Sequence, residues 1–449
     1  MRKILLEQGA ARVPRYTSYP PATSFHSAVT EADYRDWLAS LPADDPVALY
    51  LHVPFCREVC WYCACNMKLV RRENPLLDYT AVLAQEIDLL ADALPGRLAA
   101  GAIHWGGGTP TSLTDACLES LFEKIRDRFD VDEASEVAFE LDPRTFEPSR
   151  AKFLASLGVD RASLGVQEFD ASVQAAVNRV QPYEQVQDVV VSLRDAGIDN
   201  INFDLMYGLP KQTSSTLTQT VERTLKLRPA RIALFGYAHV PWMAKRQTQI
   251  DETELPNLED RLEQAESAAD ALVAGGYRRI GLDHFALTDD GLSRALDEGR
   301  LKRTFQGYSA ELSATILGLG SSSISTLSDG YVQNHAEAGA WSRAIADGRL
   351  PVHRGYRLTS EDRLRAHIIE MIMTQLQVDI GAAAHRFGYP ENHLDTSLDL
   401  CRAFVDQRLV TISGRCLSVA EAARPALRLI AAAFDSHFKR KQTRHAIAV

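Results

Sequence analysis

Short apolar runs rich in β-branched residues alternate with amphipathic stretches through the first two-thirds of the chain. Strands joined by helical connections pair in parallel, with helices covering the sheet. The pattern therefore predicts an α/β fold, either a partial or complete (β/α) barrel or an open doubly wound sheet. The predicted strands are VALYLHV from Val47, AIHW from Ala102, VAFEL from Val137, RASLGV from Arg161, INFDLMYGL from Ile201, RIALFGYA from Arg231 and RRIGLDHFA from Arg278.

The segments on either side of this alternation differ from it. The first 46 residues include PRYTSYPPATSF, which lacks clear periodicity and predicts an extended N-terminal arm. Beyond about Leu350, SEDRLRAHIIEMIMTQLQ predicts an amphipathic helix with Ser360 as N-cap. RLVTISGRCLSVA predicts a hairpin, and a helix closing in FKRKQTRH follows. We therefore predict an arm (1–46), a β/α barrel domain (47–350) and a mostly helical, winged-helix-like C-terminal domain (351–449).

Polar residues and glycines gather where the predicted strands end. In parallel α/β folds, the carboxyl ends of the strands carry the functional site. We therefore expect the site at this end of the barrel. The residues concerned, in strand order, are Cys56; Gly106, Gly107 and Gly108; Glu140 and Asp142; Gln167; Asp204; and Tyr237 and His239.

Composition narrows the class of protein. The chain has 449 residues, 46% hydrophobic and 24% charged, which excludes disorder as its main state. A formal charge of -10 argues against nucleic acid as a general partner, although a winged-helix regulator stays open as an alternative. No stretch approaches the roughly 18 apolar residues of a membrane helix, and the opening lacks a secretory h-region. We expect a cytoplasmic protein without a membrane partner.

Four of the seven cysteines lie close together, at Cys56, Cys60, Cys63 and Cys65. The spacing Cx3Cx2C supplies three soft thiolate ligands of the kind that bind an iron–sulfur cluster. Zinc is the competing interpretation, with Cys65 or His52 as the further ligand. If Cys65 closes an iron–sulfur cluster, the site serves electron transfer only. If Cys65 stays free, one iron is open to a small molecule and the cluster is catalytic.

The Cx3Cx2C spacing resembles the signature of the radical S-adenosylmethionine (SAM) enzymes. Further segments are similar, in order and spacing, to the oxygen-independent coproporphyrinogen III oxidases, and they cover almost the whole chain. They include PRYTSYP, LYLHVPFCREVCWYCACN, HWGGGTPT, FELDPR, LGVQEF, NFDLMYGLPKQT and FQGY. The resemblance implies a partial (β/α) radical SAM barrel that binds a [4Fe-4S] cluster and two SAM molecules.

Carried over residue by residue, the resemblance assigns roles within this sequence. It implies that Cys56, Cys60 and Cys63 bind the cluster, that Cys65 is not a ligand, and that Tyr50 and Cys65 have catalytic roles. The positions that match the cluster-bound SAM are Tyr50, Gly107, Glu140 and Ile324. The positions that match the second SAM are Tyr62, Gly108, Thr109, Gln167, Arg179, Asp204 and Ala238.

The resemblance also implies a reaction and its partners. A SAM-derived 5′-deoxyadenosyl radical would start the conversion of two propionates of coproporphyrinogen III to vinyl groups, giving protoporphyrinogen IX in heme biosynthesis. A flavodoxin or ferredoxin system would donate electrons, and we expect a monomer. The candidates for pairing with the substrate carboxylates are Arg15, Arg179 and Lys211.

Some residues depart from the family pattern and keep alternatives open. Ala64 stands between two cysteines where the family usually has glycine, Gly236 replaces a polar residue, and SAELSAT follows FQGY in place of a threonine-rich run. The alternatives are radical SAM paralogues, either a heme chaperone or a tetrapyrrole methyltransferase.

Overall fold

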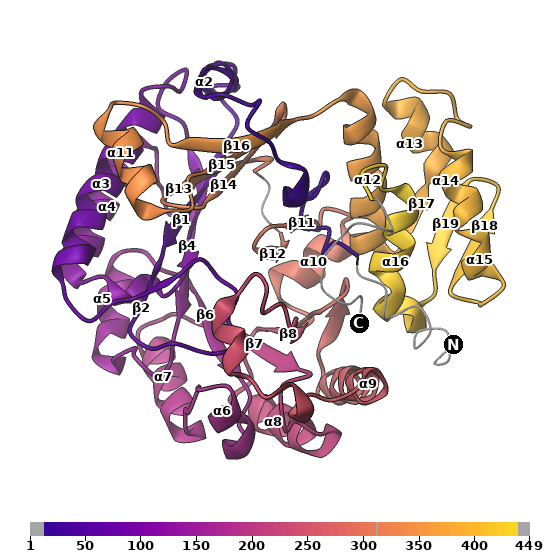
Figure 1. Ribbon diagram of the computed structural model, residues 1–449, viewed down its shortest axis with the longest axis horizontal. Coiled ribbons are helices and arrows are strands. Elements are labelled where there is room, and N and C mark those ends of the chain that lie inside the picture. Colours follow the sequence, from indigo (N-terminus) through magenta and orange to yellow (C-terminus); the bar gives the residue numbers. More distant parts are fainter. Residues whose placement is uncertain (1–12, 311–312, 439–449) are drawn as a thin grey trace.

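A curved sheet forms the centre of the computed structural model, which describes residues 13–310 and 313–438. Six of its strands run parallel and lie side by side in sequence order (Figure 1). An open doubly wound sheet would reverse this order at a switch point, so the partial barrel is confirmed. The six strands are β1 (Val47–Val53), β4 (Ala100–Gly107), β5 (Glu136–Leu141), β6 (Arg161–Gln167), β7 (Asn200–Tyr207) and β8 (Arg231–Gly236).

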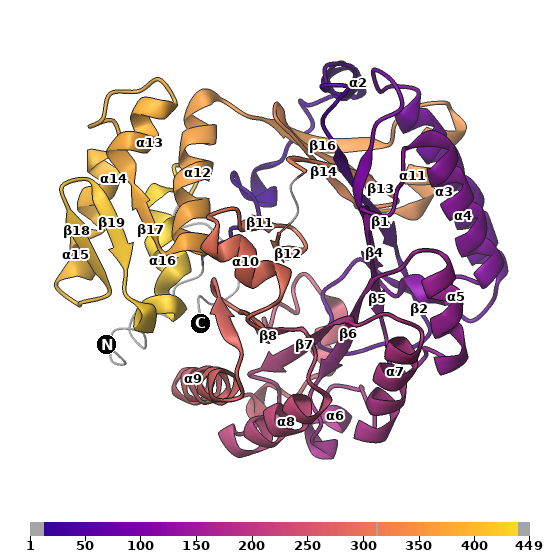
Figure 2. The same ribbon diagram turned by 180° about the vertical axis from the view of Figure 1, so that it is seen from behind.

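Helices that follow these strands in the chain cover the outer face of the sheet (Figure 2). Local signals fix where they begin: Thr114 accepts a hydrogen bond from the amide of Cys117, and Thr213 forms a capping box with Thr216. The covering helices are α3 (Asn74–Ala91), α4 (Asp115–Arg128), α5 (Ala151–Ser156), α6 (Ala171–Ala176), α7 (Tyr183–Asp195), α8 (Ser214–Leu227) and α9 (Leu258–Ala274).

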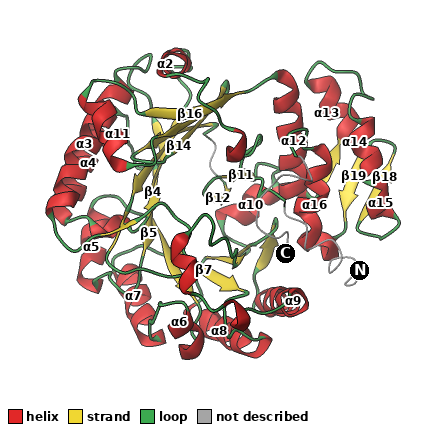
Figure 3. Cartoon of the chain, viewed as in Figure 1, coloured by secondary structure: helices red, strands yellow, loops and turns green. Residues whose placement is uncertain are grey.

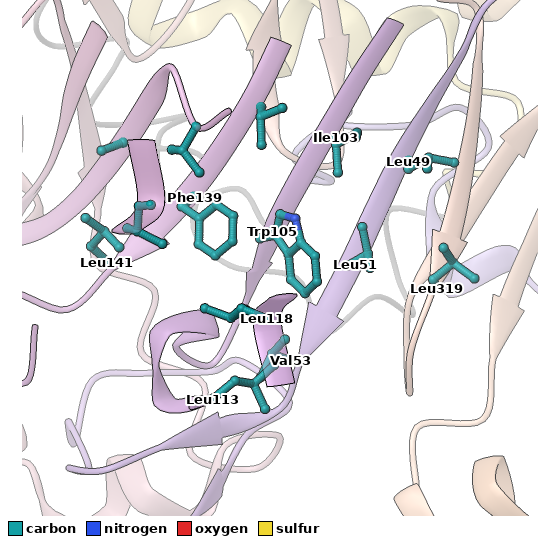
Figure 4. Packing of buried hydrophobic residues seen from close by; sticks show 14 of the residues in the cluster. Leu49, Leu51, Val53, Ile103, Trp105, Leu113, Leu118, Phe139, Leu141 and Leu319 are labelled. Atoms are coloured by element: carbon teal, nitrogen blue, oxygen red, sulfur yellow. The ribbon is translucent and has the colours of Figure 1, made fainter. Parts of the chain in front are cut away.

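The main hydrophobic core lies between the sheet and these helices (Figure 4). Trp105 on β4 stacks on Phe139 of β5 and on Phe122 of α4, with ring centroids 5.2 and 5.3 Å apart. Because side chains alternate along a strand, the neighbours of these residues, such as His104 and Glu140, point to the inner face. The inner face is therefore free to carry polar chemistry.

The seventh predicted strand, RRIGLDHFA, is not one strand. It forms β9 (Arg278–Ile280) and β10 (His284–Ala286), which pair antiparallel, and β10 also pairs antiparallel with β8. Gly281 between them has a φ of 54°, a left-handed conformation that turns the chain. After this edge come α10 (Gly291–Asp297) and the hairpin of β11 (Lys302–Thr304) and β12 (Gly307–Ser309).

The other half of the sheet was not predicted. Strand β13 (Thr315–Leu319) pairs parallel with β1, and an antiparallel meander continues through β14 (Ile324–Leu327), β15 (Gly330–Asn334) and β16 (Val352–Arg357). Helix α11 (Ala338–Ala346) lies between the last two strands. The sheet therefore extends past the predicted boundary at Leu350.

The N-terminal segment is less extended than predicted, because it contains α2 (Glu31–Ala39). A capping box between Thr30 and Asp33 begins this helix. Two contacts tie the preceding segment to the C-terminal domain. The Tyr16 hydroxyl donates to Asp435 at 3.0 Å, and the guanidinium of Arg428 donates to the carbonyl of Pro14 at 2.9 Å.

The C-terminal domain is mostly helical, with a small sheet (Figure 3). The predicted hairpin is present, and a third strand joins it in the order β17-β19-β18. Thr359, not Ser360, caps the long helix, because its hydroxyl accepts from the amide of Asp362 at 3.1 Å. The elements are α12 (Ser360–Gln375), β17 (Gln377–Asp379), α13 (Ile380–Arg386), α14 (Asp395–Leu400), α15 (Arg402–Val405), β18 (Val410–Ser413), β19 (Cys416–Val419) and α16 (Leu427–Ala431).

Two further sequence predictions concern the C-terminal end of the chain and membrane-spanning helices. Most of the predicted closing helix at FKRKQTRH lies outside the described residues. Within residues 13–310 and 313–438, no helix is both long and apolar enough to cross a membrane.

A buried carboxylate, Glu86 of α3, ties the helices to the edge half of the sheet. It accepts hydrogen bonds from the amide of Gly320 at 2.6 Å, from the side chain of Asn334 at 2.6 Å and from the Trp341 indole at 3.0 Å. Glu86→Gln would place an amide N–H against one of these donors. We expect it to lower the free energy of unfolding by about 1–3 kcal/mol in a urea titration.

The control for this prediction is Glu119→Gln, the same substitution at an exposed position of α4. Surface substitutions of this kind change stability by less than about 0.5 kcal/mol. Equal unfolding midpoints for the two variants would contradict a structural role for Glu86.

Candidate active site

The cysteine loop follows β1 and lies against the glycine turn that ends β4. Cys56 belongs to β2 (Phe55–Cys56), which pairs with β3 (Lys68–Leu69). The amide of Gly108 donates to the carbonyl of Val53 at 2.8 Å. A Cβ atom at Gly108 would lie 2.7 Å from the Phe55 carbonyl oxygen, so this close approach requires glycine.

Two arginines hold the sulfur of Cys60. Arg144 donates to Sγ at 3.1 Å and Arg179 donates to it at 3.2 Å. The two guanidinium groups approach the sulfur from different segments of the chain and fix its position. The side chain of Cys60 is thus held in place by residues that follow β5 and α6.

Asp142 binds both of these arginines. Its carboxylate lies 2.6 Å from Arg144 Nη2 and 3.1 Å from Arg179 Nη2, and all three side chains are less than a tenth exposed. Burial alone would raise the pKa of Asp142, but the two guanidinium groups lower it to about 2. Asp142 is therefore the shared counterion of the two arginines that contact the cysteine loop.

The other cysteines of the loop also receive hydrogen bonds. The Thr109 hydroxyl donates to Cys56 Sγ at 3.5 Å, and the amide of Cys65 donates to Cys63 Sγ at 3.4 Å. Donors to sulfur are a recurring feature of iron–sulfur sites and set their potential. Cys65 itself is exposed, and its side chain lines the central cavity.

The donor set distinguishes a cluster from a single metal ion. Across the described parts of the chain, no three Cys, His, Asp or Glu side chains are arranged to hold one ion. A zinc site needs its donors to converge within about 2.0–2.3 Å of one ion, whereas a cubane takes each cysteine at a different iron. Three thiols on one loop, each with a donor to its sulfur, fit a [4Fe-4S] cluster.

A cavity of about 480 Å³ opens beside this loop, on the inner face of the barrel. Tyr50, Gly107, Glu140 and Ile324 all line it, so the structure brings together the four positions expected around the cluster-bound SAM. Strands β1, β4 and β5 are direct neighbours in the sheet, and β14, which is far from them in sequence, is separated from β1 only by β13.

Two carboxylates stand in this cavity with different partners. Glu140 accepts a hydrogen bond from the amide of Gly107 at 3.0 Å, and burial raises its pKa to about 7. Asp204 accepts from Asn202 at 2.9 Å and from Ser163 at 3.3 Å, and burial raises its pKa as well. Both carboxylates have remaining lone pairs for a ligand's hydroxyl or amino group.

Of the seven residues expected around a second SAM, only Asp204 lines this cavity. Thr109 and Arg179 contact cysteine sulfurs instead, and Ala238 lines a second, smaller pocket. Gly108 packs on Phe55. The remaining two are placed elsewhere: Tyr62 packs beside a small hydrophobic cluster that includes Tyr237, and Gln167 ends β6 with a φ of 66°.

The three residues predicted to pair with substrate carboxylates lie in three different places in the structure. Arg179 is committed to Asp142 and Cys60, and Lys211 pairs with Glu254 at 3.4 Å outside the cavity. Arg15 is exposed and lines the smaller pocket.

Sequence reasoning missed several residues of the site. His52, named from the sequence only as a further ligand in the zinc interpretation, lies in the cavity wall. Its ring nitrogens are 3.2 Å from the Tyr50 hydroxyl and 3.1 Å from the Asn66 carbonyl. Burial lowers its pKa, so it is neutral. Arg144 is the last residue of the segment FELDPR, and nothing else in the sequence indicated that it contacts a cysteine. The cavity also holds the pair Arg161–Glu136, at 2.7 Å.

Comparisons with known proteins identify the family of the chain. The family model described as Radical SAM superfamily matches residues 50–224. The oxygen-independent coproporphyrinogen III oxidase of Bradyrhizobium diazoefficiens is 43% identical, with 99% of each chain covered. The Helicobacter pylori (strain ATCC 700392 / 26695) protein of the same name is 37% identical, with 95% of this chain and 94% of its own covered.

A solved structure gives the same result for the fold. It is the coproporphyrinogen III oxidase of Escherichia coli, described as a radical SAM enzyme. The two structures superpose with a TM-score of 0.91 at 33% sequence identity. The match includes 94% of this chain and 98% of the Escherichia coli chain. The chain belongs to the oxygen-independent coproporphyrinogen III oxidases of the radical SAM superfamily.

Proposed function

We propose that the protein converts two propionates of coproporphyrinogen III to vinyl groups, giving protoporphyrinogen IX in heme biosynthesis. The observation that carries this proposal is the cysteine loop, which borders a cavity of about 480 Å³ lined by Tyr50, Glu140 and Asp204. Each conversion removes one hydrogen atom, one CO2 and one electron from a propionate. The C–H bond is too weakly acidic for any side-chain base near neutral pH, so a cofactor is required.

We assign the cluster to Cys56, Cys60 and Cys63, with Cys65 left free. When bound, the cluster and SAM would supply the radical chemistry that removes a hydrogen atom from the propionate β-carbon. Tyr50, Gly107, Glu140 and Ile324 would hold the first SAM. The second SAM would be held by the remaining set, Tyr62, Gly108, Thr109, Gln167, Arg179, Asp204 and Ala238.

The residues of the chain position and shield these groups. The Gly107 amide fixes Oε2 of Glu140, which leaves Oε1 to accept from an amino group. Asp204 is suited to accept from ribose hydroxyls in the same way. Cys65 and Tyr50 reach the same cavity, where we propose that they act on the reacting groups.

Further parts of the proposal concern partners and organisation. The reaction needs a one-electron donor, which we take to be a flavodoxin or ferredoxin system, and we propose that the protein is a monomer.

All seven cysteines are free thiols, as is usual in the cytoplasm, where we place the protein. Separate hydrophobic cores support a barrel domain and a C-terminal domain after the arm, with the barrel domain extended to Arg357.

Anaerobic turnover with coproporphyrinogen III, SAM and dithionite tests the proposal. We expect two 5′-deoxyadenosines and two CO2 for each protoporphyrinogen IX, with a monovinyl tripropionate intermediate appearing first. S-adenosylhomocysteine without CO2 would instead indicate a methyltransferase. Bound porphyrin without conversion would indicate a heme chaperone.

A further inference from the structure

A second cavity, of about 80 Å³, lies where the N-terminal arm, the barrel edge and the C-terminal domain meet. In Figure 1 the indigo arm runs between the barrel and the C-terminal helices. The residues around this cavity, called the arginine pocket below, include five arginines and a single acidic residue. They are Arg15, Arg261, Arg279, Arg303, Arg428 and Asp283.

The single carboxylate of the arginine pocket is already engaged. Asp283 lies 2.8 Å from the His284 ring nitrogen and 3.5 Å from Arg303 Nη1. Although burial opposes it, the charges of these neighbours hold the pKa of Asp283 well below its usual range. One carboxylate cannot balance five guanidinium groups, so the lining carries a strong excess of positive charge.

Arg279 shows this excess most directly. Within the described residues its side chain makes no hydrogen bond and no ion pair, and its guanidinium carbon lies 6.0 Å from the ring centre of Phe285. The Nε atoms of Arg279 and Arg303 are buried without a hydrogen-bond partner. Glu266, Asp270 and Glu421 act on Arg279 only through longer-range attraction. Buried donors without acceptors are costly, and an anion in the pocket would satisfy them.

The other arginines repel one another. Burial, together with Arg15 and Arg303, lowers the pKa of Arg428 to about 10. An anion bound between these guanidinium groups would relieve this repulsion. Planar guanidinium groups suit carboxylates in particular, because they can donate two parallel hydrogen bonds.

The arginine pocket is a neighbour of the main cavity. Phe235 lines both cavities, and His284 and Tyr308 line the main cavity beside it. The ring centroids of Phe235 and His284 are 5.7 Å apart, and those of His284 and Tyr308 are 5.1 Å apart. Arg303 stacks on Tyr308 at 4.6 Å from its ring centre. A space of about 80 Å³ accommodates a carboxylate on a short alkyl chain but not a macrocycle.

We propose that the arginine pocket binds propionate carboxylates of the tetrapyrrole that are not being decarboxylated, while the ring occupies the main cavity. This inference rests on the proposed function for the identity of the substrate. It explains how a monovinyl intermediate with three carboxylates would be retained for its second reaction. It also explains release of the product, which has lost two of the four charges.

A binding measurement tests the pocket without turnover. The probe is coproporphyrin III, the oxidised and unreactive tetracarboxylate, titrated into the cluster-loaded protein, with its tetramethyl ester as neutral probe. We expect Arg279→Gln to weaken binding of the acid about tenfold or more and to leave ester binding unchanged. The matched control is Arg424→Gln, since Arg424 is buried nearby but bonds to Glu421 and Gly281 and does not line the pocket.

Other results of this titration would overturn the inference. They are an equal loss for acid and ester, an equal loss in the control variant, or unchanged acid binding in Arg279→Gln. A carboxylate could also come from SAM. If Arg279→Gln lost affinity for SAM alone and kept its affinity for coproporphyrin III, the pocket would not bind the substrate.

Turnover gives a second readout. We expect Arg279→Gln to raise KM for coproporphyrinogen III and to release a larger share of the monovinyl intermediate, with the visible absorption of the cluster unchanged. Arg279→Lys, which keeps the charge, should restore part of the effect. If the wild-type protein failed to turn over while the carboxylate-dependent binding persisted, the proposed reaction would be wrong and the pocket would stand.

Discussion

Replacing Cys56, Cys60 or Cys63 with alanine is expected to abolish turnover and to remove the iron from anaerobically purified protein. The loop supplies three thiols and each receives a hydrogen bond at its sulfur, so the loss of any one leaves too few ligands for a cubane. The wild-type protein should contain about four irons per chain. Iron analysis and the visible absorption of each variant measure the effect.

Cys65→Ala is the control for these variants. Cys65 is exposed and lines the cavity, and we place it outside the ligand set, so the variant should keep its iron and colour. Because we assign Cys65 a catalytic role, its turnover should fall. A colourless Cys65→Ala protein would show that the cluster has a fourth cysteine ligand and would contradict the assignment.

The parallel half of the barrel could be predicted because its strands are continuous apolar runs separated by helices. The edge half could not. Strands β13 to β16 are short, and glycine and serine residues such as Gly318 and Ser325 weaken their apolar pattern. They are held by pairing with β1 and with one another, and such long-range pairing is absent from a local pattern.

The candidate cluster ligands could be named from the sequence, but the side chains that contact them could not. Four clustered cysteines stand out in any reading of the sequence, and glycines after a strand point to close backbone approach. The contacts of Arg144 and Arg179 with Cys60 join residues that lie 84 and 119 positions apart. Only the folded barrel shows that these arginines share one carboxylate and one sulfur.

Asp142→Asn is expected to be the most destabilising single change around the cysteine loop. It would leave Arg144 and Arg179 buried without their shared counterion. Breaking a buried ion pair by removing one partner costs about 3–5 kcal/mol. Arg144 would keep its contact with Glu58, at 2.9 Å, so the larger part of the loss falls on Arg179. Urea denaturation of the full-length variant at neutral pH measures the loss.

The pH dependence provides a separate check on this role of Asp142. Its pKa is about 2 in the folded protein and about 4 in an unfolded chain. The carboxylate therefore stabilises the wild type above about pH 4, and this contribution falls as the pH decreases toward 2. Asp142→Asn should lack this part of the acid dependence. The matched control is Asp395→Asn, which breaks an exposed pair with Arg415 and should leave the unfolding midpoint almost unchanged. Similar losses in the two variants would mean that the buried carboxylate does not hold the arginines of the cysteine loop.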